Sequence, residues 1–157
     1  AGKVVVDSFI QAFIVSFIFT LIFLSFVFRD YKKVFLCISS LSLAFVMLIF
    51  LMIVFKINLN FANMISLPLL FSLGISYPIY FISRFSEEKT LENVFKSNTP
   101  LAILCSALTT IASFGTLYFS PHDGTSSMGL LLFLSLSTTL ISSLIFLPLI
   151  TLSINSR

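Results

Sequence analysis

Residues 61–83 read FANMISLPLLFSLGISYPIYFIS, a run of apolar and small polar side chains without a single charge. A helix needs about 20 mainly apolar residues to cross the hydrocarbon core of a bilayer. The run is long enough for that, and it is too long for an ordinary buried strand. Inside a membrane, a helix satisfies all of its backbone hydrogen bonds internally. The stretch therefore predicts a membrane-spanning helix.

Charge-free runs of similar length occupy most of the remaining chain. Of the 157 residues, 58% are hydrophobic and only 10% are charged, whereas soluble domains contain about 25% charged residues. The other runs cover residues 8–28, 34–55, 100–119 and 127–152. We therefore predict an all-α fold, a polytopic bundle of five transmembrane helices that forms a single transmembrane domain over residues 1–157.

The segment between the third and fourth predicted spans is charged and amphipathic. In SEEKTLENVFKSN, residues 86–98, Leu91 and Val94 share one helical face and the glutamates lie mainly in the first half. Acidic residues near a helix start are favourable, and Ser86 is a suitable N-cap. The pattern predicts a short helix over residues 86–97 that lies at the cytoplasmic membrane interface.

The basic residues are unevenly distributed between the two sides of the predicted bilayer. One side has only Lys3 and Lys56. The other has Arg29, Lys32, Lys33, Arg84, Lys89, Lys96 and Arg157. Because positively charged loops stay in the cytoplasm, we expect the amino terminus outside and the carboxyl terminus inside.

The first seven residues lack the basic and apolar regions of a signal peptide. A chain whose amino terminus lies outside is then expected to continue from a preceding outer domain. We therefore interpret the sequence as part of a larger polytopic protein, with an independent five-span protein as the alternative.

Hydroxyl side chains recur at helical spacing in three spans that contain no ionisable residue. They are Ser72, Ser76 and Ser83 in the third span, Ser106, Thr109, Thr110 and Ser113 in the fourth, and Ser135, Thr138, Thr139 and Ser142 in the fifth. One interpretation is close helix packing, with interhelical hydrogen bonds worth about 0.6 kcal/mol each. The other is a hydrated seam or conformational hinge between these helices.

Pro68, Gly74 and Pro78 make the third span the least regular. A proline inside a helix removes a backbone donor and kinks the helix unless neighbours satisfy the freed carbonyl. A broken helix can mark a transport site, but prolines are also common in membrane helices generally. The three residues therefore predict either a hinge or a simple kink.

Motifs for catalysis, metal binding and cofactor binding are absent. The sequence has no GxSxG, HExxH or CxxC pattern, so we expect neither an enzyme nor a metal or cofactor site. The clustering of charge between apolar runs also argues against nucleic-acid binding. His122 lies alone in the loop LYFSPHDGTSSMGLL, residues 117–131, where Pro121 and Gly124 indicate a turn and Gly129 would let the fifth span approach a neighbour.

Three stretches carry a resemblance to a known superfamily. The stretch INLNFANMISLPLLFSLGISYPIYFISR, residues 57–84, resembles the fourth-helix motif of one half of the resistance-nodulation-division (RND) transporters. The stretch from LENVFKSN to the loop resembles the next two helices of the mycobacterial-membrane-protein-large group. The sequences SALTT, ASFG and HDGTSSMG point more narrowly to the hopanoid-type lipid transporters.

The resemblance implies a bacterial inner-membrane exporter that moves hydrophobic lipids toward the outer envelope. The chain would supply helices two to six of one half of such a transporter, and the carboxyl-terminal half is favoured. It would lack the first helix and the periplasmic porter domain of that half. Its partners would be membrane lipids and the rest of the same transporter, and the assembly would be a homodimer or homotrimer.

Ser76 departs from a pattern common among RND proteins. Many of them place a proton-carrying aspartate in a GxGxD context of the fourth helix, and the alignment of Gly74 and Tyr77 puts Ser76 at that position. A serine does not exchange protons near neutral pH, so proton coupling through this half is in doubt. We predict that Ser76 faces the hydroxyls of the fourth and fifth spans, as a former relay position in a neutral packing seam.

Two alternative functions remain open at this point. One is a membrane module that does not transport, similar to sterol-sensing domains or to protein-export accessory subunits. The other is a degenerate remnant of a transporter.

Overall fold

The computed structural model describes the backbone of residues 2–155 and the side chains of residues 4 and 6–153. This part of the chain is helical and contains no strand, and five of its helical segments are long and apolar enough to cross a membrane. The predicted all-α bundle of five spans is confirmed. The first two spans are α1, Gly2–Phe28, and α2, Tyr31–Val54.

The other three spans are each built from consecutive helical pieces. The third contains the 3₁₀ turn η1, Asn63–Ile65, then α3, Ser66–Gly74, and α4, Ser76–Glu88. The short helix α5, Leu91–Lys96, leads to the fourth span, which contains α6, Thr99–Gly115, and the 3₁₀ turn η2, Thr116–Phe119. The fifth contains α7, Asp123–Ile141, the π turn η3, Ser142–Phe146, and α8, Leu147–Asn155.

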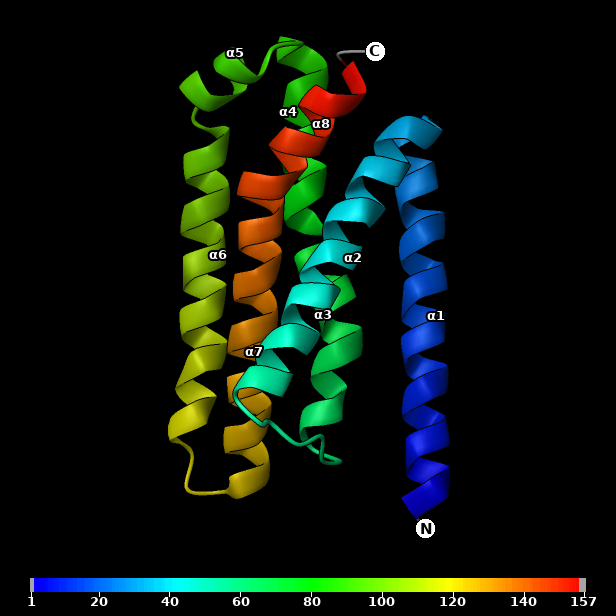
Figure 1. Cartoon of the computed structure of the whole chain (residues 1–157), viewed down its shortest axis with the longest axis vertical. Helices are drawn as coiled ribbons and strands as arrows, with labels where there is room; N and C mark the ends of the chain where they lie inside the picture. The colour runs from blue at the N-terminus through cyan, green and yellow to red at the C-terminus, as the bar shows by residue number, and fades with distance from the viewer. Residues whose placement is uncertain (1, 156–157) are drawn as a thin grey trace.

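The fifth span forms the centre of the bundle. Figure 1 shows α7 and α8 between α6 on one side and α2 and α3 on the other, with α1 at the edge. In the apolar 18-residue stretch of the fifth span, 50% of the residues are buried inside the bundle. In the corresponding stretch of the first span, only 11% are buried. The first span is therefore a peripheral helix with two neighbours, α2 and α3.

Aromatic rings attach α1 to the rest of the bundle. The Phe71 ring on α3 makes edge-on contacts with the rings of Phe13 and Phe17 on α1, at centroid distances of 5.2 and 5.5 Å. The Phe13 ring also lies 5.6 Å from that of Phe45 on α2. Such pairs contribute about 0.5–1.5 kcal/mol each beyond the area they bury.

Two helix irregularities have proline as their physical cause. The third span breaks at Ile75, between α3 and α4, where Pro78 provides no N–H for the carbonyl of Gly74. Pro68, by contrast, is the third residue of α3, where a missing N–H costs nothing. Gly74 and Pro78 thus adjoin the break and Pro68 does not, and whether they form a hinge or a simple kink stays a prediction. The π turn η3 was not predicted from the sequence; it ends at Phe146, two positions before Pro148.

The short helix predicted over residues 86–97 is wrong in its first half. Ser86 belongs to α4, where its Oγ donates to the carbonyl of Ile82 at 2.8 Å and does not cap a new helix. The α4 helix ends at Lys89, which adopts a left-handed conformation with φ 60°. Only α5 follows, and its Val94 is completely buried.

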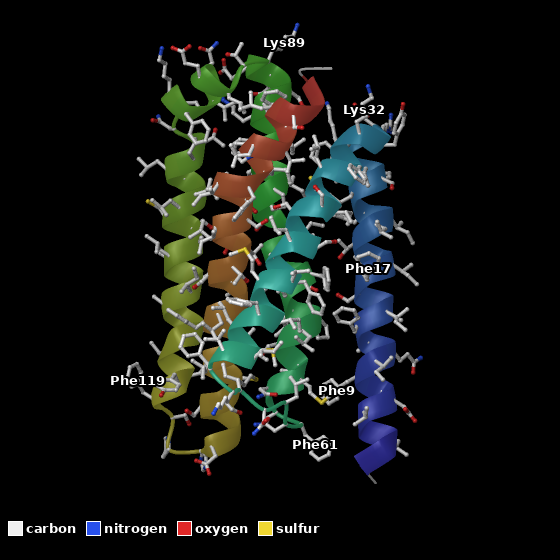
Figure 2. All side chains as sticks on the ribbon, in the orientation of Figure 1. Phe9, Phe17, Lys32, Phe61, Lys89 and Phe119 are labelled. Atoms are coloured by element: carbon white, nitrogen blue, oxygen red, sulfur yellow. The ribbon has the colours of Figure 1, made fainter. Side chains whose placement is uncertain are left out.

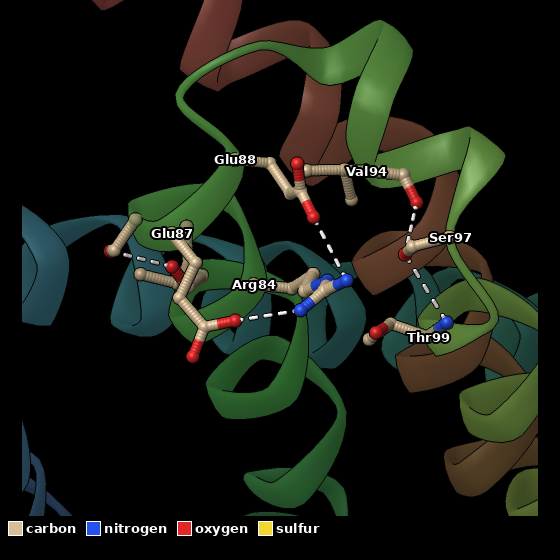
Figure 3. Close-up of polar contacts among 8 residues, drawn as sticks. Arg84, Glu87, Glu88, Val94, Ser97 and Thr99 are labelled. Carbon is tan, nitrogen blue, oxygen red and sulfur yellow. Dashed lines mark hydrogen bonds and ion pairs between the residues drawn. The ribbon is translucent and has the colours of Figure 1, made fainter.

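An ion-pair cluster lies where α4 meets α5. The Arg84 guanidinium bonds the carboxylates of Glu87 and Glu88, each at 2.8 Å, as Figure 3 shows. In the same region the Thr99 N–H donates to Ser97 Oγ at 3.3 Å. These contacts fix the connection between the third and fourth spans.

The fifth span begins earlier than predicted. Its first helix α7 starts at Asp123 and not near residue 127, because Gly124 and Ser126 are already helical. The Ser126 hydroxyl reaches back across the loop and donates to the carbonyl of Tyr118 at 2.7 Å. The loop between the fourth and fifth spans is therefore short and tightly bonded.

Candidate functional site

The hydroxyls of the fifth span lie in the core of the bundle. Ser135, Thr138, Thr139 and Ser142 are each at most 1% exposed. Ser142 links two helices, because its Oγ donates to the Ser40 carbonyl on α2 at 2.7 Å and lies 3.0 Å from the Ser40 hydroxyl. This contact joins the π turn directly to α2.

The two serines of the π turn should respond differently to removal of the hydroxyl. Ser142→Ala breaks both contacts with Ser40, and we expect it to lower the free energy of unfolding by about 0.6–1.7 kcal/mol. Ser143→Ala should leave stability unchanged or raise it slightly, since the buried Ser143 Oγ has no hydrogen-bond partner in the described structure. Thermal unfolding of both variants in the same detergent measures the difference. Equal effects would contradict this assignment.

The hydroxyls of the fourth span do not meet those of the fifth. Ser106, Thr109 and Ser113 are exposed, and α6 turns a different face, with Ile103, Ala107 and Ile111, toward the bundle. The expected seam shared by the fourth and fifth spans is therefore not formed. The hydroxyls of Thr109, Thr110 and Ser113 donate to carbonyls of their own helix and need no partner.

Two of the fourth-span hydroxyl residues, Ser106 and Thr110, instead lie toward α4. Thr110 shares a side-chain hydrogen bond with Tyr77. Ser106 lines a shallow depression of about 320 Å³ together with Tyr77 and Tyr80.

Ser76 is the first residue of α4, directly after the break at Ile75. Its Oγ donates to the Leu73 carbonyl at 2.9 Å, and the residue is half-buried. Within the described chain, no hydrogen bond joins Ser76 to α6 or α7. That Ser76 is a former relay position stays a prediction.

Gly74 and Thr139 bring the helix break and the buried hydroxyls together. A Cβ added at Gly74 would lie 2.7 Å from Cγ2 of Thr139. Only a glycine allows α3 to approach α7 this closely. The break in the third span therefore packs directly against the central helix.

A groove between α1 and α3 contains hydroxyls that the sequence analysis did not single out. It has a volume of about 530 Å³ and walls that include Val15, Phe19 and Ile75. Ser16 of α1 lines it, and the Ser16 Oγ donates to the Pro68 carbonyl at 3.2 Å and lies 3.5 Å from the Ser72 Oγ. Ser72 therefore faces α1 and not the fourth or fifth span.

Thr20 is the second α1 hydroxyl in this groove. The residue is 4% exposed, and its hydroxyl forms no hydrogen bond within the described residues. Ser16 and Thr20 are four residues apart and so share a helix face. The four-residue spacing of these two hydroxyls in the first predicted span, residues 8–28, is the sequence signal that could have identified them.

The groove is suited to an amphiphilic ligand. Its lining combines apolar side chains with three hydroxyls, Ser16, Thr20 and Ser72, and includes no charged residue. Pockets of about 300–1,000 Å³ with mainly apolar walls and a few polar groups are typical of small-molecule sites. Among the described residues, no group of His, Cys, Asp or Glu is placed to hold a metal ion.

Two characterised transporters are similar to nearly the whole chain. The hopanoid transporter HpnN of Rhodopseudomonas palustris is 38% identical, and that of Burkholderia multivorans is 34% identical, each over 148 residues and 94% of this chain. Nearly the whole chain is thus similar to one part of these two transporters. It spans 17% of the length of either relative. No protein-family model matches it.

The similarity agrees with the motifs of residues 57–133 that indicated the RND superfamily. The chain is a multi-pass membrane protein, and its five spans account for most of the described residues.

Proposed function

We propose that the chain is a membrane-embedded part of a transporter that moves hopanoid-like lipids from the bacterial inner membrane toward the outer envelope. The similarity to hopanoid transporters supports this proposal. The observation that carries it on the structural side is the groove between α1 and α3, with Thr20 as a free hydroxyl. A rigid apolar lipid with one polar end would place its polycyclic body against Phe19 and Ile75 and its hydroxyl near Thr20.

The proposed orientation follows from the charges at the two ends of the bundle. Lys32 and Lys89 lie at one end, and the loops with Phe61 and Phe119 lie at the other, as Figure 2 shows. We assign the basic end to the cytoplasm. The amino terminus would then lie in the periplasm. The remainder of the transporter would complete the path, and the whole would assemble as a homodimer or homotrimer.

The other sequence-predicted residues have structural roles in this proposal. Ser76 replaces a proton carrier by a neutral group, so this part of the transporter would not carry protons. The α7 hydroxyls, with Gly74 and Pro78, form a packing seam next to the helix break. The α6 hydroxyls, Ser106, Thr109, Thr110 and Ser113, contribute to a surface that adjoins α4.

Blocking the groove tests the proposal. The chain is reconstituted in nanodiscs with a photoactivatable hopanoid alcohol, and the labelled peptides are identified by mass spectrometry. Val15→Trp narrows the groove and should lower labelling of α1 and α3 about tenfold, equivalent to about 1.4 kcal/mol. Ile14→Trp is the matched control, because Ile14 is the adjacent residue, is exposed at 51% against 57% for Val15, and does not line the groove.

Removal of the Thr20 hydroxyl tests the same site with a smaller change in side-chain shape. Thr20→Val keeps the shape of the side chain and removes one hydrogen bond worth about 0.5–1.5 kcal/mol. We expect binding of the hopanoid alcohol to weaken about twofold to tenfold, with no change for the corresponding hydrocarbon. If neither Val15→Trp nor Thr20→Val lowers the labelling of α1 and α3, the groove is rejected as the lipid site. Absence of hopanoid binding together with a secretion defect after gene deletion would favour a protein-export role.

A further inference from the structure

A pocket lies at the basic end of the bundle, away from the α1–α3 groove. It is enclosed by the start of α2, the end of α4 and one residue of α8, Thr151, and has a volume of about 420 Å³. Its apolar lining consists of Leu36, Ile82 and Phe85, of which the first two are buried. Since α2 begins and α4 ends here, the pocket lies at the level where a membrane changes from acyl chains to headgroups.

Three lysines surround this apolar floor. Lys32, Lys33 and Lys89 line the pocket, and Asp30 is the one acidic residue in its lining. The Asp30 carboxylate accepts the backbone N–H of Lys32 at 3.0 Å as the N-cap of α2. The pocket therefore carries an excess of positive charge.

The neighbouring acidic residues do not neutralise these lysines. Glu87 and Glu88 at the end of α4 pair with Arg84. Glu92 on α5 pairs with Lys96. In the part of the chain that the structure describes, these are the ion pairs present, so none of the three pocket lysines forms an ion pair with a carboxylate.

The backbone holds Lys89 in place. Lys89 closes α4 in a left-handed conformation with φ 60°, and its N–H donates to the Phe85 carbonyl at 2.9 Å. A lysine pays a conformational penalty there that glycine or asparagine would avoid.

We propose that this pocket binds an anionic phospholipid. The headgroup phosphate lies among Lys32, Lys33 and Lys89, and the first part of an acyl chain packs on Leu36, Ile82 and Phe85. Basic pockets between membrane helices on the cytoplasmic side bind such headgroups by charge attraction. The proposal does not depend on the transported lipid, because the pocket and the α1–α3 groove share no residue.

Lipid binding to purified chain distinguishes this site from general attraction to a basic surface. Native mass spectrometry measures bound phosphatidylglycerol and phosphatidylcholine after release from nanodiscs. A lysine near an anionic surface contributes about fivefold to affinity, so Lys33→Gln with Lys89→Asn should weaken phosphatidylglycerol binding about 25-fold. Asparagine is chosen at position 89 because it tolerates the left-handed conformation.

The control pair is Lys56→Asn with Lys96→Gln. Lys56 also has a left-handed conformation, with φ 52°, but it follows the end of α2 at the opposite end of the bundle, and Lys96 lies on α5 outside the pocket. Both pairs remove two positive charges. The control should retain phosphatidylglycerol binding, and circular dichroism should show equal helix content for both pairs.

A photoactivatable phosphatidylglycerol gives an independent measurement. Its label should attach to peptides from residues 30–36 and 82–89 and should be lost in the pocket pair. Equal loss of binding in both pairs, or no preference over phosphatidylcholine, would overturn the proposal. Displacement by excess inorganic phosphate would also overturn it, because the site would then recognise the anion without the lipid.

Discussion

Gly129→Ala is expected to destabilise the protein by about 3 kcal/mol or more, at the upper end of the range for overpacking. A Cβ at this position would lie 2.6 Å from the backbone nitrogen of Tyr118 and 2.7 Å from the carbonyl carbon of Leu117. Backbone atoms cannot rotate away as a side chain does, so η2 and the first turns of α7 must separate. The expectation from sequence that Gly129 permits a close approach agrees with this geometry.

The sign of the effect makes the result informative. In an unconstrained helix, replacement of glycine by alanine stabilises by about 0.5–1 kcal/mol. Gly124→Ala is the matched control, because it lies in the first turn of the same helix and its Cβ would approach only the Ala62 side chain, at 3.2 Å. Thermal unfolding in detergent should show a lower midpoint for Gly129→Ala alone. A Gly129→Ala protein as stable as the parent would contradict the close approach.

The spans were predictable from sequence because charge is excluded from the hydrocarbon core. The charge-free runs located all five, and the errors in their bounds lie at their ends. Those ends depend on local hydrogen bonds that composition does not reveal. Asp30 caps α2 and starts it at Tyr31, three residues before the run at residue 34. Gly124 and Ser126 extend the fifth span into what looked like a loop.

The partners of the hydroxyls were less predictable, for a physical reason. Periodicity placed four hydroxyls on one face of the fourth span and four on one face of the fifth. It could not tell which face is buried, because a serine or threonine hydroxyl can donate to a carbonyl of its own helix. Thr109 does so on an exposed face and Thr138 does so in the core. Burial was then decided by helix packing.

The π turn was missed although Pro148 was visible in the sequence. A proline in a membrane helix indicates an irregularity in the helix but not which kind. A kink, a 3₁₀ turn and a π turn can each accommodate the missing backbone hydrogen bond. Here the turn over Ser142–Phe146 also presents Ser142 to Ser40. The contact between two serines 102 positions apart depends on tertiary structure and has no local sequence signal.

Gly74→Ala is expected to lower the free energy of unfolding by about 1–3 kcal/mol, and Thr139→Ser in the same chain should restore part of that loss. The added Cβ would meet Thr139 Cγ2 at 2.7 Å, and serine lacks this methyl group. The serine keeps the hydroxyl that donates to the Ser135 carbonyl. Thr139→Ser alone should cost about 0.8 kcal/mol for the lost methyl.

A double-mutant cycle isolates the contact between the two helices. We expect a coupling energy of about 1–2 kcal/mol between positions 74 and 139, because residues in direct contact are not additive. Thr138→Ser is the control, since Thr138 is equally buried but contributes none of the atoms nearest to Gly74. Additive effects at positions 74 and 139 would contradict the packing of α3 on α7. Ser72 and Ile75, on either side of Gly74 in the sequence, line the groove between α1 and α3. If the contact between positions 74 and 139 sets the shape of this groove, hopanoid labelling should fall in Gly74→Ala. It should recover when Thr139→Ser is added.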